Sequence, residues 1–172
     1  KSTCRFNHKA QDEGLNTAFE QLLGEMNIKR RVSLYRNAKI KSPLLIGFFN
    51  PKVLLPKTTS TLEGDVMILR HELMHLKRGD LYYKLLMQLC ACVNWFNPLV
   101  WVMAKVSDAD LENACDEDVV KNRAEDFRHN YCESILKVVR AQKSREPVLA
   151  AGFSSRPSEI KLKLYQNGVL HK

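Results

Sequence analysis

His71-Glu72-Leu73-Met74-His75 is the stretch around which the rest of the chain can be interpreted. Apolar residues recur at helical spacing on both sides of it, so we expect it to lie inside a helix. Residues four apart share one face of a helix, one turn above the other, and His71 and His75 can therefore bind one metal ion together. Glu72 lies beside them, where it can take a proton from water. The spacing H-E-x-x-H predicts zinc-dependent peptide hydrolysis.

A catalytic zinc ion takes a third protein ligand and keeps one position for water. We expect that ligand from a helix downstream, and we choose Glu112 because Asp116 follows it one helical turn later. Glu112 would bind the metal, and Asp116 would accept the outer N–H of a ligand histidine and fix its ring. Cys115 is interpreted as a packing residue rather than a ligand. The candidates considered for the third ligand are Asp108, Asp110, Glu112, Asp116, Glu117, Asp118 and His129.

Length and composition favour one domain with a sizeable core, because the chain has 172 residues and 45% of them are hydrophobic. Its formal charge of +8 fits a solvated surface, the cytoplasmic side of a membrane, or nucleic acid. We expect no direct nucleic-acid binding, since no zinc-finger, RNP-type or basic-helix pattern is present. Five irregularly spaced cysteines without a C-x-x-C pair indicate reduced thiols. The polar start contains no secretory signal, and we expect the chain to be a piece of a longer protein.

The first 60 residues predict one helix and a few short strands. Periodicity predicts an amphipathic helix over residues 12–26. Two apolar runs predict strands, Val32–Tyr35 and Leu44–Phe49. A third strand, Lys52–Leu55, lies between two prolines, which favours an edge position in the sheet.

Capping signals predict the bounds of the helix that carries the motif. Ser60-Thr61-Leu62-Glu63 fits a capping box at its start. Gly79 fits a left-handed cap at its end, and Asp80 fits the cap of the next helix. A further helix is predicted over residues 126–142. The tail over residues 143–172 is rich in loop-forming residues, and an alternating segment at Ile160–Leu164 is too short to assign.

The most apolar stretch, Leu85–Val106, is long enough to cross a membrane. One crossing would leave the two histidines and Glu112 on opposite sides of the bilayer, where they could not share an ion. We therefore expect either a re-entrant hairpin that turns near Asn94–Pro98 or two helices buried in a water-soluble core. Pro98 suits the first position of the second helix.

Several of these segments resemble the BlaR/MecR metallopeptidases. The run from His71 to Asp80 is similar to their active-site helix, and Asn94–Trp101 is similar to their W-F-N-P-L-x-W signature. The segment Glu112–Asp116 resembles the one that supplies their third zinc ligand. The segment Pro43–Pro56 resembles the strand before their active-site helix. The resemblance extends over roughly residues 40–122.

This resemblance implies an α+β, zincin-like (gluzincin) fold that is mainly helical with a small mixed sheet. It implies the protease domain of a bacterial membrane signal transducer, placed on the cytoplasmic side. Antibiotic binding outside would trigger cleavage of a transcriptional repressor, of the transducer itself, or of both. We expect a single domain over residues 1–172, with a helix and small sheet over 1–60, an active-site core over 61–142 and a loop-rich tail.

The hypothesis is therefore Zn²⁺ held by His71, His75 and Glu112, with Glu72 as the general base. A substrate peptide would lie along the edge strand Leu45–Phe49. Self-cleavage in the Lys143–Pro147 segment is a guess from composition. Three alternatives stay open: a housekeeping membrane protease of protein quality control, a module in which zinc is only structural, and a nucleic-acid-binding domain. The trigger, the cleaved protein and the group that stabilises the oxyanion are not assigned.

Overall fold

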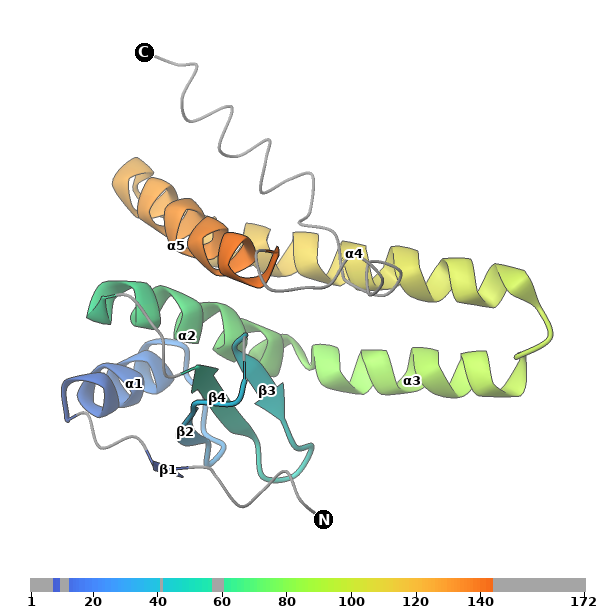
Figure 1. Cartoon of the computed structure of the whole chain (residues 1–172), viewed down its shortest axis with the longest axis horizontal. Coiled ribbons are helices and arrows are strands. Elements are labelled where there is room, and N and C mark those ends of the chain that lie inside the picture. The colour runs from blue at the N-terminus through green and yellow to red at the C-terminus, as the bar shows by residue number, and fades with distance from the viewer. Residues whose placement is uncertain (1–7, 10–12, 41, 57–60, 144–172) are drawn as a thin grey trace.

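The structure, a computed structural model, describes residues 8–9, 13–40, 42–56 and 61–143 (Figure 1). It is mainly helical with one small sheet, as an α+β fold requires. The expectations for the tail, including the Ile160–Leu164 segment, lie outside the described residues, and the division of the chain into three segments stays a prediction. The elements, in order, are β1 (His8–Lys9), α1 (Glu13–Glu25), β2 (Ser33–Asn37), β3 (Leu44–Ile46), β4 (Lys52–Pro56), α2 (Leu62–Arg78), α3 (Asp80–Val93), α4 (Pro98–Val120) and α5 (Glu125–Lys143).

The sheet is mixed and has the strand order β1-β2-β4-β3. Strands β2 and β4 run parallel, with Ser33 opposite Lys52, and the two outer pairings are antiparallel. One face of the sheet packs against α1 and α2 in the main core, which removes apolar surface from water. The buried residues of this core are Leu15, Phe19, Leu22, Met26, Leu34, Val53, Leu55, Ile68, Leu69, Leu73 and Leu76.

The predicted place of the Lys52–Leu55 strand at an edge is wrong. Strand β4 is central and pairs with β2 on one side and β3 on the other. Its prolines do not prevent this, because Pro51 precedes the strand and Pro56 is its last residue. The strand predicted as Leu44–Phe49 ends earlier, at Ile46. Gly47 turns the chain with φ +93°, and a Cβ there would lie 2.6 Å from the carbonyl oxygen of Asn50.

Helix α2 holds the motif and is capped at both ends, although its first cap differs from the prediction. The helix begins at Leu62, and Thr61 accepts a hydrogen bond from the backbone N–H of Gly64, so the cap lies one residue beyond Ser60. Gly79 ends the helix in the left-handed conformation, as predicted, and its N–H donates to the carbonyls of His75 and Leu76. This chain reversal allows α3 to begin at once with Asp80.

The apolar stretch forms a helical hairpin, and its re-entry into a membrane stays a prediction. Helices α3 and α4 lie side by side, and Figure 1 shows them extending beyond the sheet. The turn falls where expected: Asn97 caps α4 by accepting from the N–H of Leu99, and Pro98 is the first residue of that helix. The alternative of two buried helices is wrong, because most large apolar side chains of the hairpin are exposed. Among the described residues, no helix has the length and apolarity needed to cross a membrane.

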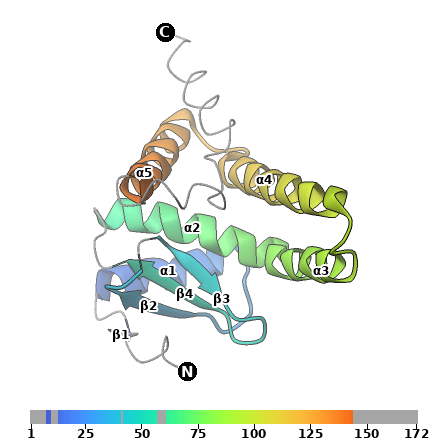
Figure 2. The ribbon, with the colours of Figure 1, turned by 45° about the vertical axis from the view of Figure 1, so that its right-hand side comes forward.

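A second, smaller core joins the end of α4 to α5 above α2, as Figure 2 shows. It contains Val119, Val120, Tyr131 and Ile135, with Met67 and Met74 of α2 packed against it. Helix α2 therefore lies between two cores, one shared with the sheet and one shared with α4 and α5. This position fixes the helix that carries the histidines from both sides.

Substitution of Gly79 by alanine should destabilise the chain by about 1 kcal/mol, because an L residue is strained in the left-handed region. No steric clash adds to this cost, since the nearest atom to a new Cβ would be 3.7 Å away, on Tyr82. The matched control is Gly24→Ala in the last turn of α1, where a Cβ would meet nothing within 4 Å. The free energy of unfolding of that variant should rise by about 0.5–1 kcal/mol. Urea denaturation measures the free energy of unfolding of both variants. An equal change in the two would contradict the assignment of Gly79 as a left-handed helix cap.

Candidate metal centre

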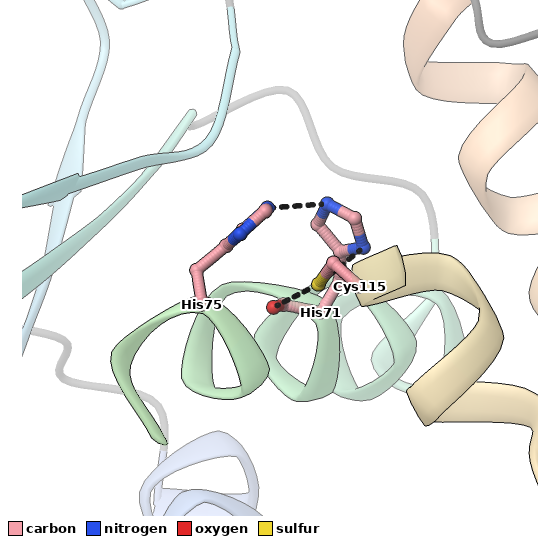
Figure 3. Close-up of side chains that lie close together, drawn as sticks. All are labelled: His71, His75 and Cys115. Atoms are coloured by element: carbon pink, nitrogen blue, oxygen red, sulfur yellow. Dashed lines mark hydrogen bonds between the residues drawn. The ribbon is translucent and has the colours of Figure 1, made fainter. Parts of the chain in front are cut away.

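The two histidines of the motif lie one turn apart on α2 and face each other. Their Nε2 atoms are 3.1 Å apart, and their rings are nearly perpendicular, at 89° (Figure 3). Both side chains are largely buried, with exposed fractions of 9% for His71 and 12% for His75. The motif therefore presents two imidazole nitrogens to one point above the helix.

The other nitrogen of each ring is held by an acid or a phenol from a different element. The Nδ1–H of His75 lies 2.7 Å from Oδ2 of Asp80 and donates to it. The Nδ1 of His71 lies 2.7 Å from the hydroxyl of Tyr131, which donates to Oδ1 of Asp116. Asp116 also approaches this Nδ1 directly, at 3.3 Å. In the neutral form of each ring these contacts favour the proton on Nδ1, so that both Nε2 atoms would present lone pairs to each other.

Glu112 of α4 lies on the side where these lone pairs meet. Its carboxylate oxygens are 3.7 Å from Nε2 of His71 and 3.6 Å from Nε2 of His75. Lys84 of α3 approaches the same carboxylate, with Nζ 3.7 Å from Oε1. The structure thus brings together His71, His75 and Glu112, with Asp116 behind the first histidine, in the relation that the sequence analysis expects.

Cys115 offers a second way to complete a set of three ligands. His71, His75 and Cys115 can place one donor atom each within 4.8 Å of one another. The Cys115 sulfur lies 3.8 Å from Nδ1 of His71 and 3.7 Å from its backbone oxygen. Figure 3 shows the thiol beside the Nδ1 end of the His71 ring, whereas the two Nε2 atoms meet at the other end. An ion at the meeting point of the Nε2 atoms would face Glu112.

The surroundings of the histidines favour a positive charge. Burial lowers the pKa of His71, but Asp116, Cys115 and Glu112 outweigh it and raise that pKa well above its usual value. The pKa of His75 is also raised, because contacts with Cys115 and Glu112 outweigh burial. Burial and the neighbouring Asp116 raise the pKa of Tyr131, so its hydroxyl keeps its proton and donates it. The surroundings of the two histidines are therefore electrostatically suited to a cation.

The donor set also fits zinc by its dimensions. Tetrahedral zinc with ligands at about 2.0–2.1 Å separates two donor atoms by about 3.3 Å. The separations between the two Nε2 atoms and the Glu112 oxygens, from 3.1 to 3.7 Å, lie around that value. Two bare nitrogens this close repel each other unless a proton or a cation lies between them. A divalent ion would remove this repulsion and compensate the buried carboxylates.

Glu72 is the remaining polar residue of the motif. Burial raises the pKa of its carboxyl group, and the nearby His71 and His75 oppose that rise. A raised pKa makes the carboxylate a better proton acceptor, as a general base requires.

The other candidates for the third metal ligand do not join the site. Asp118 pairs with Arg78 instead. Asp108, Asp110, Glu117 and His129 are exposed.

Two residues that contact the histidines are not predicted as site residues from the sequence: Asp80, which is expected to cap a helix, and Tyr131. Asp80 is not the side-chain cap of α3, because it binds His75 and Arg78 instead. The sequence could have indicated the contact of Asp80 with His75, because a residue directly after the chain reversal at Gly79 returns toward the last turn of α2. Tyr131 gives no such signal, because only the packing of α5 onto α2 brings it to His71.

Tyr131→Phe should lower the free energy of unfolding of the metal-free chain by about 1–3 kcal/mol. The change removes a hydroxyl that two buried polar atoms share, one on His71 and one on Asp116. The matched control is Tyr82→Phe, whose hydroxyl is exposed and bonds to Phe48 and Arg30. The Tyr82→Phe substitution should lower the free energy of unfolding by no more than about 0.5 kcal/mol. Chemical denaturation with a chelator present measures both, and equal losses would contradict a special role for Tyr131.

Comparison with known proteins indicates a peptidase family. The chain matches the family model described as BlaR1 peptidase M56 over residues 1–165. It is 35% identical over 153 residues to the Regulatory protein BlaR1 of Bacillus licheniformis, a match that covers 87% of the chain and 26% of that relative. It is 34% identical over 115 residues to the Methicillin resistance mecR1 protein of Staphylococcus aureus, covering 63% of the chain and 19% of that relative.

The chain thus corresponds to a minor part of these longer relatives, and the resemblance to the BlaR/MecR proteins is confirmed. Because the family model extends over nearly all of its residues, this chain belongs to the BlaR1 peptidase M56 family as a peptidase domain.

Proposed function

We propose that the chain is a zinc-dependent endopeptidase domain of the gluzincin type. His71, His75 and Glu112 would hold the ion, Glu72 would be the general base, and Asp116 would orient His71. The observation that carries the proposal is the convergence of two Nε2 atoms on Glu112 while both Nδ1 atoms are held from behind. Acidic partners of this kind raise the basicity of ligand histidines and fix their rings.

Zinc bound there would supply a Lewis acid that activates water and polarises the scissile carbonyl. The chain's own groups would manage the protons. Glu72 would accept the proton of the attacking water and deliver it to the leaving amine, a role that suits a carboxylate of raised pKa. Asp80 and Tyr131 would keep the two imidazoles in place while charge changes in front of them.

Strand β3 offers a place for the substrate backbone. Within the described sheet it is an edge strand, paired with β4 alone. It contacts α2, so a peptide added along it would run past the helix that holds the motif. An extended peptide can join such an edge through main-chain hydrogen bonds, while side-chain pockets provide specificity. The edge has only three residues, Leu44–Ile46, which is shorter than the predicted Leu45–Phe49 run.

We further infer that the domain works inside a membrane-bound signal transducer, on the cytoplasmic side, in a β-lactam response. The names of two relatives, a regulatory protein and a methicillin resistance protein, support a regulatory role linked to an antibiotic. The substrate would be a protein, either a transcriptional repressor or the transducer itself. A repressor cut at one defined position would favour signalling, and indiscriminate cleavage of casein would favour a housekeeping protease.

Glu112→Gln should lose most of its bound zinc, because an amide replaces a charged ligand. The matched control is Glu117→Gln, an exposed carboxylate further along the same helix, which should keep one zinc ion per chain. Elemental analysis after dialysis gives the metal content of both. Equal zinc content in the two variants would remove Glu112 from the ligand set.

Glu72→Gln should bind zinc normally and lose peptide cleavage by roughly 10²-fold or more, because proton transfer needs the carboxylate. Zinc content and the hydrolysis rate of labelled casein are measured on the same preparation. Retention of the full rate would end the general-base assignment, whereas loss of zinc would place Glu72 among the metal ligands.

A further inference from the structure

The hairpin of α3 and α4 has an apolar surface that the described residues do not cover. Beyond Lys84 and before Lys105, its exposed side chains are almost all apolar, and they surround both helices rather than forming one stripe. Water-soluble monomers rarely expose a continuous apolar surface of this size. The exposed large apolar residues of this surface are Leu85, Leu86, Leu89, Val93, Trp95, Phe96, Leu99, Trp101, Val102 and Met103.

Charge is excluded from the same surface. Between Lys84 and Lys105 the sequence has no Asp, Glu, Lys or Arg, although these types make up 27% of the chain. The exposed Gln88 lies one turn from Lys84, close to the charged end. The two lysines lie at comparable distances from the turn, one on each helix. They therefore mark a common level at which the hairpin changes from charged to apolar.

Three polar side chains at the turn have a hydrogen-bond partner within the hairpin itself. The Asn94 side chain donates to the carbonyl of Cys90, and the Asn97 side chain accepts from the N–H of Leu99. The indole N–H of Trp101 donates to the carbonyl of Trp95. Such partners also stabilise turns in water, where water can replace them. A turn in hydrocarbon does need them, since each unsatisfied group there costs several kcal/mol.

The length of the uncharged part matches one leaflet of a bilayer. From Lys84 to Val93, α3 rises roughly 14 Å, and from Pro98 to Lys105, α4 rises roughly 11 Å. Half of a typical hydrocarbon core is roughly 15 Å thick. Neither helix has the length to cross the whole core, in agreement with the absence of a spanning helix among the described residues.

We propose that the α3–α4 hairpin inserts into one leaflet of a phospholipid bilayer, with Trp95 and Phe96 at its deepest point and Lys84 and Lys105 at the headgroups. Lipid fits this surface better than a protein partner does, because a partner helix or groove would cover a single stripe and leave the rest exposed. Lysine ammonium groups at the boundary would meet lipid phosphates, while their carbon chains remain in the apolar layer.

Insertion to this depth would hold the metal centre close to the membrane surface. Glu112 follows Lys105 by seven residues, a rise of roughly 11 Å along α4. The Lys84 ammonium, at the proposed boundary, lies 3.7 Å from the Glu112 carboxylate. This consequence rests on the proposed peptidase function: bonds cut by the domain would lie in segments that run near the bilayer. The insertion itself requires neither zinc nor cleavage.

Intrinsic fluorescence tests the insertion directly, because both tryptophans of the chain, Trp95 and Trp101, lie in the hairpin. The full chain, free of metal, is mixed with vesicles of phosphatidylcholine and phosphatidylglycerol whose acyl chains carry bromine at different depths. The Trp101→Phe variant reports on Trp95, and Trp95→Phe reports on Trp101. Deep bromines should quench Trp95 most, and Trp101, roughly 5 Å nearer the charged level, should respond to shallower ones.

Charged substitutions at the turn provide a second test of the insertion. Trp95→Asp combined with Phe96→Asp should weaken vesicle binding roughly tenfold or more, because aspartate is costly in hydrocarbon. Both side chains are more than 70% exposed, so the fold should be kept, and circular dichroism checks this. The matched control, Leu62→Asp, changes an exposed apolar residue at the far end of α2 and should bind vesicles like the unmodified chain.

Two outcomes would overturn the proposal. One is the absence of quenching by bromine at every depth. The other is a chain that dimerises without vesicles and becomes monomeric in the doubly charged variant, which would make the surface a contact between copies. Neither outcome affects the zinc content or cleavage by the domain, so the proposed function would stand or fall separately.

Discussion

The opposed pair of imidazoles is the constraint on which the arrangement of this domain depends. Spacing on α2 places the two rings on one face, but spacing alone does not decide which nitrogen each ring presents. Contacts with Asp80, Tyr131 and Asp116 determine it, since they hold both Nδ1 atoms. The two Nε2 atoms then face each other, 3.1 Å apart. These three residues come from α3, α5 and α4, so each described helix that follows α2 contributes to one feature. Packing of α2 between two cores keeps the pair rigid.

Local rules predicted much of this arrangement. Helical periodicity placed α1, α2 and α5 within a few residues, and the four-residue spacing of the histidines placed them face to face. The distance between Glu112 and Asp116 implied one acid in front of the histidines and one behind; their carboxylates approach different nitrogens of His71, and their roles as ligand and orienting group stay predictions. The break at Asn97-Pro98 predicted the turn of the hairpin. These successes share a cause, since each depends on neighbours within about one or two helical turns.

Long-range packing explains what could not be predicted. The place of β4 inside the sheet depends on β2, fifteen or more residues earlier, and its flanking prolines concealed a central strand. Tyr131 reaches His71 only because α5 folds back over α2. Asp80 was assigned to capping because that rule is local, whereas the ring of His75 is the stronger partner for a buried carboxylate. In each case the deciding interaction joins elements that are far apart in the sequence.

The identity of the third ligand is the central claim, and zinc X-ray absorption spectroscopy of the loaded chain tests it most directly. Nitrogen and oxygen ligands lie at about 2.0–2.1 Å from zinc, and a thiolate lies at about 2.3 Å, so the two are well separated. We expect a first shell of nitrogen and oxygen alone, with the imidazole signature of His71 and His75 and no sulfur. A sulfur contribution at the longer distance would make Cys115 the ligand in place of Glu112 and would contradict the account.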